Sequence, residues 1–403
     1  MSLHDTVSAE RPHIAFFGMR NAGKSSLVNA VTGQELSVVS DVKGTTTDPV
    51  KKAMELLPLG PVVIIDTPGL DDEGTLGSLR VKKARDILSQ TDAAVLVVDA
   101  AAGIGEQDRD LIRVFEEKEI PFVIALNKAD LLPRRDAPSE NALYVSALTG
   151  ENLDKLKDRL GDFARRKSSN KRIVADLIRP GDMVVLVIPI DEAAPKGRLI
   201  LPQQQTLREL LDAHCTAVCC QDTELRNTLT GLTKKPALVI TDSQAFGRVS
   251  KDTPTDIPMT SFSILFARYK GSLETLVSGA AELGRLKDGD HVLIAEGCTH
   301  RRQCGDIGTV KMPAWIRKFS GAEPVFDFSS GGEFPDDLSG YALIVHCGGC
   351  MLNEAAMQSR ISRASDAGVP IVNYGVAIAH MHGILRRSLS PFPEVLRVLD
   401  AQS

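Results

Sequence analysis

The sequence predicts an α/β protein of three consecutive domains, residues 1–170, 175–265 and 266–403. Short apolar runs of strand type alternate with helical stretches along the chain, which is the pattern of mostly parallel sheets covered by helices. Glycine-rich and cysteine-rich turns directly follow several of these runs, at the sheet edge where such folds bind ligands. We expect a larger first domain, then two smaller α/β domains, of which the last is doubly wound.

The composition is that of an ordinary globular protein. Hydrophobic residues make up 43% of the 403 residues, and the formal net charge of -5 argues against a nucleic acid partner. No apolar run approaches the ~20 residues of a membrane span. Residues 1–12 lack the apolar core of a signal peptide, so we expect a cytoplasmic protein without a membrane partner. The seven cysteines then favour free thiols and metal ligands over disulfides.

The first domain opens on a phosphate-binding loop. The apolar run 14–17 leads into Gly18-Met-Arg-Asn-Ala-Gly-Lys-Ser25, and a helical stretch, 26–32, follows. The glycines of such a loop let backbone N–H groups wrap the phosphates, while Lys24 reaches the β and γ oxygens and Ser25 coordinates Mg²⁺. The predicted phosphate-binding residues are Gly18, Asn21, Ala22, Gly23, Lys24, Ser25 and Ser26.

Two further motifs complete the phosphate end of this site. The apolar run 62–65 ends in Asp66-Thr-Pro-Gly69, where Asp66 can hold the Mg²⁺ shell and the Gly69 amide can sense the γ-phosphate. Upstream, the threonines of 44–48 supply a mobile hydroxyl for the same ion, which we assign to Thr46. The predicted catalytic residues are Lys24, Ser25, Thr46, Asp66 and Gly69.

The next motifs predict which base is bound. The apolar run 122–126 leads into Asn127-Lys-Ala-Asp130, and Ser146-Ala147 follows a later short strand. A carboxylate such as Asp130 accepts from guanine N1–H and from the exocyclic amine, whereas adenine would leave it buried and unpaired. The predicted base-binding residues are Asn127, Lys128, Asp130, Ser146 and Ala147. These ordered motifs predict GTP as the nucleotide, with GDP as its product.

The five motifs resemble those of the translation-factor-like small GTPases, and among them the group that includes the tRNA-modification GTPase. Leu70 follows Asp-Thr-Pro-Gly, where Ras-type proteins carry the glutamine that orients the attacking water. Asn21 stands where potassium-stimulated members place a metal-binding asparagine. The resemblance therefore implies GTP hydrolysis stimulated by K⁺, which would supply the positive charge of an arginine finger. The alternative is that Asn21 only shapes the loop.

The middle stretch predicts a small α/β unit without a catalytic constellation. Its expected strands and helices are, in chain order, 183–190, 203–213, 216–220, 224–229 and 237–241. Cys215, Cys219 and Cys220 lie in or beside the second strand, and we expect them to be small buried hydrophobic residues. A sheet with no evident site is a candidate for self-association.

The last domain carries two islands of metal-binding side chains. Cys298-Thr-His300 follows the apolar run 292–295, and His346-Cys347-Gly-Gly-Cys350 follows the apolar run 342–345. Both islands should therefore emerge where a strand ends. Two thiolates at i and i+3 can hold one metal centre, and adjacent glycines let the backbone approach it. From the residues alone, a structural zinc site and an iron–sulfur cluster are equally compatible with this donor set.

With the GTP motifs at one end and C-x-H followed by H-C-x-x-C at the other, the chain resembles the HydF family, the GTPase maturation proteins of FeFe-hydrogenases. The resemblance covers all three domains and is most specific in the two islands. It implies a 4Fe-4S cluster held by three cysteines, with histidines at hand for the remaining position. The metal ligands so implied are Cys298, Cys347, Cys350, His300 and His346, in addition to Ser25 and Thr46 for Mg²⁺.

The same resemblance implies partners and a role. In that family the middle domain forms a homodimer, and the protein carries a di-iron precursor from two radical-SAM maturases to apo FeFe-hydrogenase. This chain would then be a GTP-hydrolysing scaffold and carrier. One alternative is a tRNA- or ribosome-associated GTPase with a structural zinc site, which would need a basic face or an RNA-binding module that the sequence does not show. Another is a redox enzyme, for which full thiolate ligation would be expected.

Overall fold

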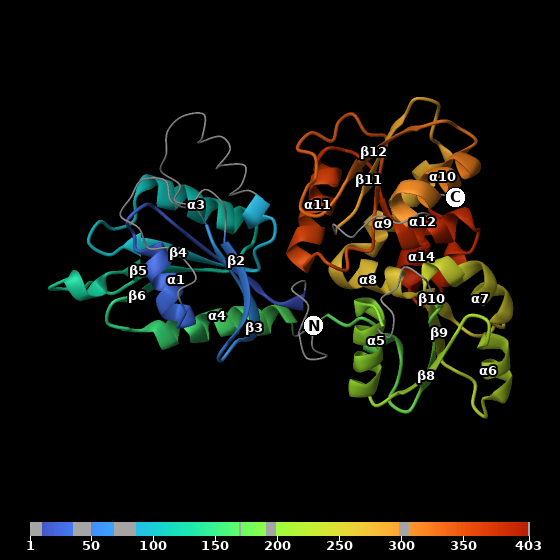
Figure 1. The fold of residues 1–403 in the computed structure, drawn as a ribbon, viewed down its shortest axis with the longest axis horizontal. Coiled ribbons are helices and arrows are strands. Elements are labelled where there is room, and N and C mark those ends of the chain that lie inside the picture. The colour runs from blue at the N-terminus through green and yellow to red at the C-terminus, as the bar shows by residue number, and fades with distance from the viewer. Residues whose placement is uncertain are drawn as a thin grey trace. The chain divides into compact units, whose positions relative to one another are not determined.

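The computed structural model describes residues 10–34, 50–67, 86–168, 171–190, 199–297 and 306–401, with no side chains described for 164–168. The chain divides into two compact units, Met1–Asn170 and Lys171–Ser403. Helices and strands carry the labels of Figure 1. Within the described ranges, no helix combines the length and the apolar character that a membrane crossing requires.

The first unit is built on a six-stranded sheet of order β2-β3-β1-β4-β5-β6. Its strands pair in parallel, except that β2 runs antiparallel to β3. In chain order they are β1 (His13–Gly18), β2 (Val50–Leu56), β3 (Gly60–Asp66), β4 (Ala93–Asp99), β5 (Phe122–Asn127) and β6 (Ala142–Tyr144). The central strands are buried on both faces, which explains why they read as continuous apolar runs in the sequence.

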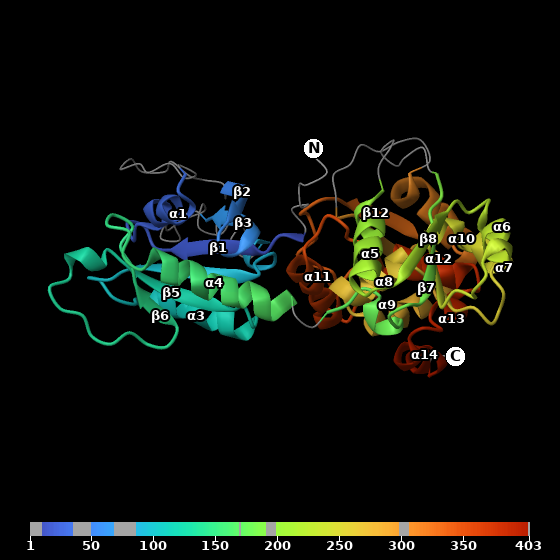
Figure 2. The same cartoon turned by 90° about the horizontal axis from the view of Figure 1, so that it is seen from below.

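Helices cover both faces of this sheet. One apolar core joins the sheet to α1 (Lys24–Thr32) and α4 (Leu153–Ser168), and a second joins the opposite face to α3 (Glu106–Glu117). Figure 1 shows α3 and α4 on the two sides of the strands, and Figure 2 shows the same unit from below. The predicted strands 14–17, 62–65 and 122–126 and the predicted helix 26–32 are confirmed.

The second unit contains two four-stranded sheets. One has the order β10-β9-β7-β8 and the other β12-β11-β13-β14, and every pairing in them is parallel. The strands are β7 (Met183–Val187), β8 (Thr216–Cys220), β9 (Leu238–Thr241), β10 (Met259–Ser261), β11 (His291–Ala295), β12 (Val325–Ser329), β13 (Leu343–His346) and β14 (Ile371–Asn373). Counted along the chain, the strands of both sheets have the order 2-1-3-4. The second strand is added on one side of the first strand and the third on the other side, so the reversal point of each sheet lies between its first and third strands. This confirms the α/β fold class, including the doubly wound last part.

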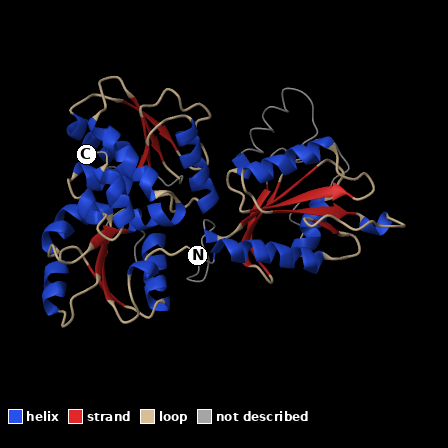
Figure 3. Cartoon of the chain, turned by 180° about the vertical axis from the view of Figure 1, so that it is seen from behind, coloured by secondary structure: helices blue, strands red, loops and turns tan. Residues whose placement is uncertain are grey.

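Helices lie between and around the two sheets. They are α5 (Leu201–Asp212), α6 (Leu225–Gly231), α7 (Phe246–Asp252), α8 (Phe262–Lys270), α9 (Leu273–Ala280), α10 (Met312–Ser320), α11 (Glu354–Asp366), α12 (Tyr374–Met381), α13 (Leu385–Ser388) and α14 (Pro393–Asp400). Both sheets share one continuous apolar core, to which α8, α9 and α12 contribute buried residues. Figures 1 and 3 show these helices between the two groups of strands.

The structure corrects three local predictions. The strand expected over 183–190 ends at Val187, just before Ile188 and Pro189, because proline has no N–H to donate to a ladder. The apolar residues of 273–286 recur at helical spacing, which predicts one helix, but the observed helix ends at Ala280 and continues as a 3₁₀ turn. Cys219 was predicted to be buried but is exposed, because β8 is an edge strand of its sheet.

Candidate functional site

The phosphate-binding loop joins β1 to α1 and lies directly on the ends of neighbouring strands. A Cβ at Gly18 would lie 2.5 Å from the carbonyl oxygen of Val97 in β4. Gly23 has φ +82°, and a Cβ there would lie 2.4 Å from Nδ2 of Asn127. Only glycine fits these two positions, because any side chain would displace the backbone or the amide beside it. Asn21 also has a positive φ, +64°, which asparagine tolerates better than most residues.

Three residues predicted to act on the phosphates and Mg²⁺ meet at the end of β3. Lys24 Nζ forms an ion pair with Asp66 Oδ1, and Ser25 Oγ donates to Asp66 Oδ2 across 3.2 Å. Asp66 is only 3% exposed. The neighbouring Thr67 hydroxyl donates to the carbonyl of Phe16 across 2.7 Å, which fixes this end of β3 against β1. The carboxylate is therefore held between the lysine and the hydroxyl of the phosphate-binding loop.

Asn127 links the phosphate loop to the base-binding loops. Its Nδ2 donates to the carbonyl of Ala22 across 3.0 Å and to that of Gly23 across 3.3 Å. Its Oδ1 accepts from the backbone N–H of Ala147 across 3.1 Å. The side chain is almost completely buried. One amide thus brings three of the predicted segments together, although they lie far apart in the sequence.

The Asp130 carboxylate is oriented by a buried serine. Ser146 Oγ donates to Asp130 Oδ1 across 2.5 Å and accepts from the backbone N–H of Thr149 across 3.1 Å. Ser146 is fully buried, so its hydroxyl has few other orientations available. Such an arrangement presets the carboxylate for a base that offers two N–H donors.

Sequence reasoning missed Asp99, which forms an ion pair with Lys128 of the base-binding loop 127–130. Lys128 adopts φ +61°, and its Nζ pairs with Asp99 Oδ2 at 2.7 Å. Burial acts to raise the pKa of Asp99, but the hydrogen bonds from Lys128 and the amide of Ala101 hold it below its usual range. The available signal was the position of this aspartate at the end of the apolar run that forms β4.

The Cys347 island lies at the reversal point of the last sheet. β13 ends at His346, which pairs in register with Ala295, the last residue of β11. These are the first and third strands of the sheet, and open α/β sheets bind ligands outside the carboxyl ends of such a pair. The described chain continues from β11 to Gly297, directly before Cys298. The prediction that the His346–Cys350 island follows a strand end is therefore confirmed, whereas Cys298 and His300 lie outside the described residues.

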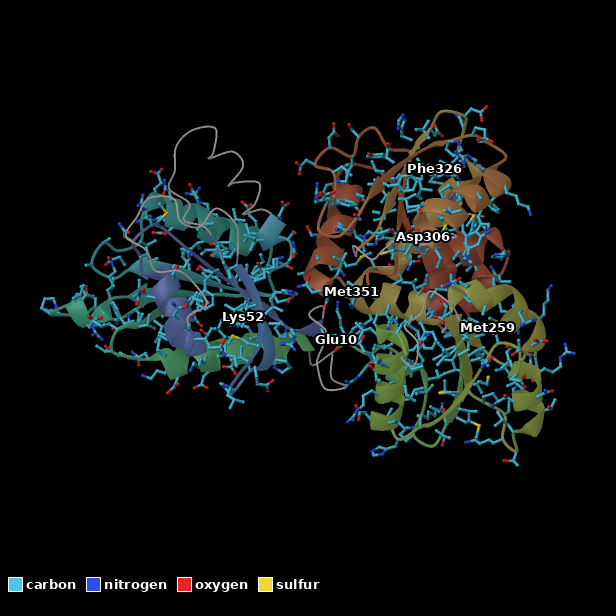
Figure 4. All side chains as sticks on the ribbon, viewed as in Figure 1. Glu10, Lys52, Met259, Asp306, Phe326 and Met351 are labelled. Atoms are coloured by element: carbon cyan, nitrogen blue, oxygen red, sulfur yellow. The ribbon has the colours of Figure 1, made fainter. Side chains whose placement is uncertain are left out.

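Backbone N–H groups point at the sulfur of Cys347. The N–H of Gly297 donates to Sγ across 3.0 Å and that of Gly349 across 3.4 Å. Hydrogen bonds of this kind stabilise a thiolate and tune a metal bound to it. Cys350 is half-buried in the same loop, and burial raises the pKa of its thiol against the opposing effect of nearby Lys270. Figure 4 labels Met351, the exposed residue that follows Cys350.

His346 is fully buried, and both nitrogens of its ring contact protein groups. Nδ1 lies 2.7 Å from the carbonyl oxygen of Cys347, and Nε2 lies 2.9 Å from Nη1 of Arg360. Burial, together with the adjacent guanidinium, lowers the pKa of His346 to about 3. The ring is therefore neutral, and its role as a metal ligand stays a prediction.

Sequence reasoning also missed two buried cations beside this loop. Lys270, the last residue of α8, is 4% exposed, and its Nζ donates to the carbonyl of Leu352 across 2.9 Å and approaches that of Cys350 at 3.4 Å. Arg360, in the middle of α11, is 5% exposed. The available signal was a basic residue on the apolar face of a helix.

Several predicted residues lie outside the described ranges: Thr46, Gly69, Leu70, Cys298 and His300. Within those ranges, no group of three or more histidine, cysteine, aspartate or glutamate side chains is placed to hold a metal ion. The structure thus brings together Lys24, Ser25 and Asp66 in the first unit, and Cys347 with His346 in the second. Ser26 lies in the first turn of α1 and is half-buried.

Comparison with curated proteins finds several GTPases that are similar to part of the chain. GTPase Era of Rippkaea orientalis is 29% identical over 235 residues, which are 54% of this chain and 69% of that protein. GTPase Der of Kosmotoga olearia is 33% identical over 166 residues, 36% of this chain and 37% of that protein. The tRNA modification GTPase MnmE of Streptococcus agalactiae is 31% identical over 152 residues, 37% of this chain and 32% of that protein. The chain thus spans about a third of the length of Der and MnmE.

Three family models match the chain in succession. Residues 13–128 match the 50S ribosome-binding GTPase family, so the first domain is a GTPase domain. Residues 173–271 match the hydrogen maturase F dimerization domain, and residues 274–391 match the hydrogen maturase F tetramerization domain. The last two matches together cover more than half of the chain and include the whole of both sheets of the second unit. The chain belongs to the hydrogen maturase F (HydF) family.

Proposed function

We propose that this protein is a cytoplasmic GTP-hydrolysing scaffold and carrier in the maturation of FeFe-hydrogenase. It binds a 4Fe-4S cluster, receives a di-iron precursor built by two radical-SAM maturases, and delivers that precursor to apo FeFe-hydrogenase. The observation that carries the proposal is the Cys347 loop. This loop lies at the reversal point of a hydrogen maturase F sheet, in a chain that also has a GTPase domain. Family membership favours this role over a tRNA- or ribosome-associated GTPase with a zinc site.

The nucleotide site supports hydrolysis of GTP with Mg²⁺. Lys24, which pairs with Asp66 in this structure, would bind the β and γ oxygens, and Ser25 with Thr46 would coordinate the ion. Asp66 would hold the water ligands of Mg²⁺, and the Gly69 amide would sense the γ-phosphate. These groups position the phosphates and neutralise charge, which is most of what phosphoryl transfer requires.

Base specificity is tested by Asp130→Asn. The variant donates where the carboxylate accepted, so guanine loses two charge-assisted hydrogen bonds, about 3 kcal/mol or more in total. We expect weaker GTP binding by about two orders of magnitude, and a switch in preference toward xanthosine triphosphate. Competition binding with the two nucleotides measures this switch. Equal competition by ATP and GTP in the unmutated protein would show that Asp130 does not read the base.

Potassium stimulation is tested by Asn21→Ala. We expect the unmutated protein to hydrolyse GTP about tenfold faster or more in KCl than in NaCl, because the cation stands in for an arginine finger. In Asn21→Ala the two salts should give equal rates, while nucleotide affinity stays close to normal. Steady-state phosphate release in matched salts measures the effect. If the unmutated protein shows no difference between the salts, Asn21 only shapes the loop.

The donor set of the second unit fits an iron–sulfur cluster. Cys347 and Cys350 lie in one glycine-containing loop, the amides of Gly297 and Gly349 already point at sulfur, and Cys298 follows directly after Gly297. Soft thiolates at this spacing suit iron–sulfur clusters, and three of them would leave one iron for a weaker ligand. We propose His300 as a candidate for that position. Bound there, the cluster would supply a place where a second metal unit attaches and departs.

The carrier role calls for a maturation assay. The protein, co-expressed with the two radical-SAM maturases and purified without oxygen, is mixed with apo FeFe-hydrogenase, and hydrogen evolution is measured. We expect activation only by protein from the co-expression. An apo-hydrogenase that stays inactive with this protein would contradict delivery.

We also propose that the middle domain forms a homodimer, in keeping with its family match, and gel filtration with light scattering tests this.

A further inference from the structure

Two buried cations hold the Cys347 loop by its backbone carbonyls. Lys270 reaches the carbonyl groups at one end of the loop, and Arg360 reaches the other end through the ring of His346. We propose that Arg360 is a positioning residue for the metal centre. Through His346 it fixes the Cys347 carbonyl, and its charge favours the reduced form of a cluster on this loop. The second part of this inference rests on the proposed cluster binding.

The contacts define a directed chain of hydrogen bonds. A guanidinium only donates, so Nε2 of His346 must accept from Arg360 Nη1 at 2.9 Å. The ring proton is then on Nδ1, which donates to the carbonyl of Cys347 at 2.7 Å. The imidazole is fixed as one neutral tautomer, and it could offer a nitrogen to a metal only by breaking one of these contacts. His346 therefore acts as a link between α11 and the loop.

The geometry of the loop follows from this link. His346 holds the carbonyl of Cys347, and the N–H of Gly349 donates to the sulfur of the same residue across 3.4 Å. Gly349 has φ +61°, and a Cβ there would lie 3.2 Å from the sulfur of Met357 in α11, the helix that also carries Arg360. Helix α11 thus positions the Cys347 carbonyl through Arg360 and His346, and it packs against Gly349 through Met357.

The charge of Arg360 is compensated poorly by its hydrogen-bond partners. In the described part of the chain these are the His346 ring and the carbonyl of Gly331 at 2.6 Å, and the guanidinium also stacks on the ring of Phe334 at 5.1 Å. All three are neutral. A buried charge is costly unless an opposite charge lies near it. A cluster held by three thiolates is anionic and becomes more so on reduction, so it would provide that charge.

A matched control is available on the same helix. Arg363 stacks on the same Phe334 ring at 5.1 Å, donates to the carbonyl of Pro335 and pairs with Asp336, so among the described residues its partners differ from those of Arg360. Arg363→Gln therefore removes a neighbouring positive charge without removing the contact to the imidazole. Arg360→Met removes both charge and contact, Arg360→Gln removes the charge but keeps an N–H donor, and Arg360→Lys keeps the charge.

The first measurement uses the metal-free protein and does not depend on a cluster. ¹⁵N NMR of the histidine rings should show His346 as the tautomer protonated at Nδ1 in the unmutated protein and in Arg363→Gln. In Arg360→Met the ¹⁵N chemical shift of Nε2 should no longer be that of a nitrogen that accepts a hydrogen bond. A His346 ring protonated at Nε2 in the unmutated protein would overturn the positioning role.

The second measurement is a redox titration of the reconstituted cluster, followed by electron paramagnetic resonance. At the midpoint potential of the unmutated protein, we expect the reduced-to-oxidised ratio to fall about tenfold in Arg360→Met and Arg360→Gln. Arg360→Lys should restore most of it, and Arg363→Gln should leave it nearly unchanged. Equal potentials in all variants would overturn the charge role. If the unmutated protein takes up no cluster, the proposed function fails, while the NMR result still decides the positioning role.

Discussion

Lys24→Ala is expected to lose about a hundredfold or more in GTP turnover and to keep its cluster. Lys24 is the cation of the phosphate-binding loop, and removal of one preorganised charge from a phosphoryl-transfer site typically costs two to three orders of magnitude. The cluster should persist because Lys24 and Cys347 belong to separate compact units. Phosphate release at saturating GTP measures the loss, and iron content with the visible spectrum measures the cluster.

The matched control for this variant is Lys118→Ala. Lys118 is exposed where α3 ends, so its removal should change neither property. Loss of iron together with turnover in Lys24→Ala would contradict the independence of the two units.

Cys347→Ser is expected to abolish stable cluster loading and to leave GTP turnover intact. A serine hydroxyl is a poor ligand for iron because it keeps its proton at neutral pH, and the two backbone N–H groups would face a neutral hydroxyl in place of a thiolate. Iron and sulfide per chain after anaerobic reconstitution measure the loading. Cys219→Ser is the matched control, because Cys219 is exposed on the edge strand β8 and should not affect it. Full iron content in Cys347→Ser would show that this thiol is not a ligand.

Much of the nucleotide site could be predicted because each motif is local. Gly18, Lys24 and Ser25 lie within one loop, and the chemistry of such a loop depends on residue types at fixed spacing. The link between loops could not be predicted in this way. Asn127 bonds to the carbonyl of Ala22, 105 residues earlier, and only the pairing of β4 with both β1 and β5 brings the two together.

The same limit applies to the second unit. The strand before each island could be predicted from its apolar run, but not the two cations that hold the Cys347 loop. Lys270 lies 80 residues before Cys350, and Arg360 reaches His346 through a tertiary contact between α11 and the end of β13. The exposure of Cys219 depends on strand order, since the same apolar pattern in a central strand would have buried it.

The periodicity of the sequence predicts the two sheets of the second unit but not the core that they share. Alternating strands and helices predict two small α/β parts, and both sheets are present. Their shared core includes residues of α8, α9 and α12, and most residues of α8 and α12 are buried. A helix that is apolar on all sides is recognisable from sequence as buried, but the partners that cover each side are not.

The central claim is that the Cys347 loop and Cys298 hold an iron–sulfur cluster in a GTPase. The most direct test is metal analysis and electron paramagnetic resonance of the anaerobically purified, reconstituted protein. We predict a brown protein with about four iron and four sulfide per chain, and a reduced-state spectrum that added imidazole perturbs, because one iron lacks a thiolate. A colourless protein with one tightly bound zinc per chain and no iron uptake would contradict the account.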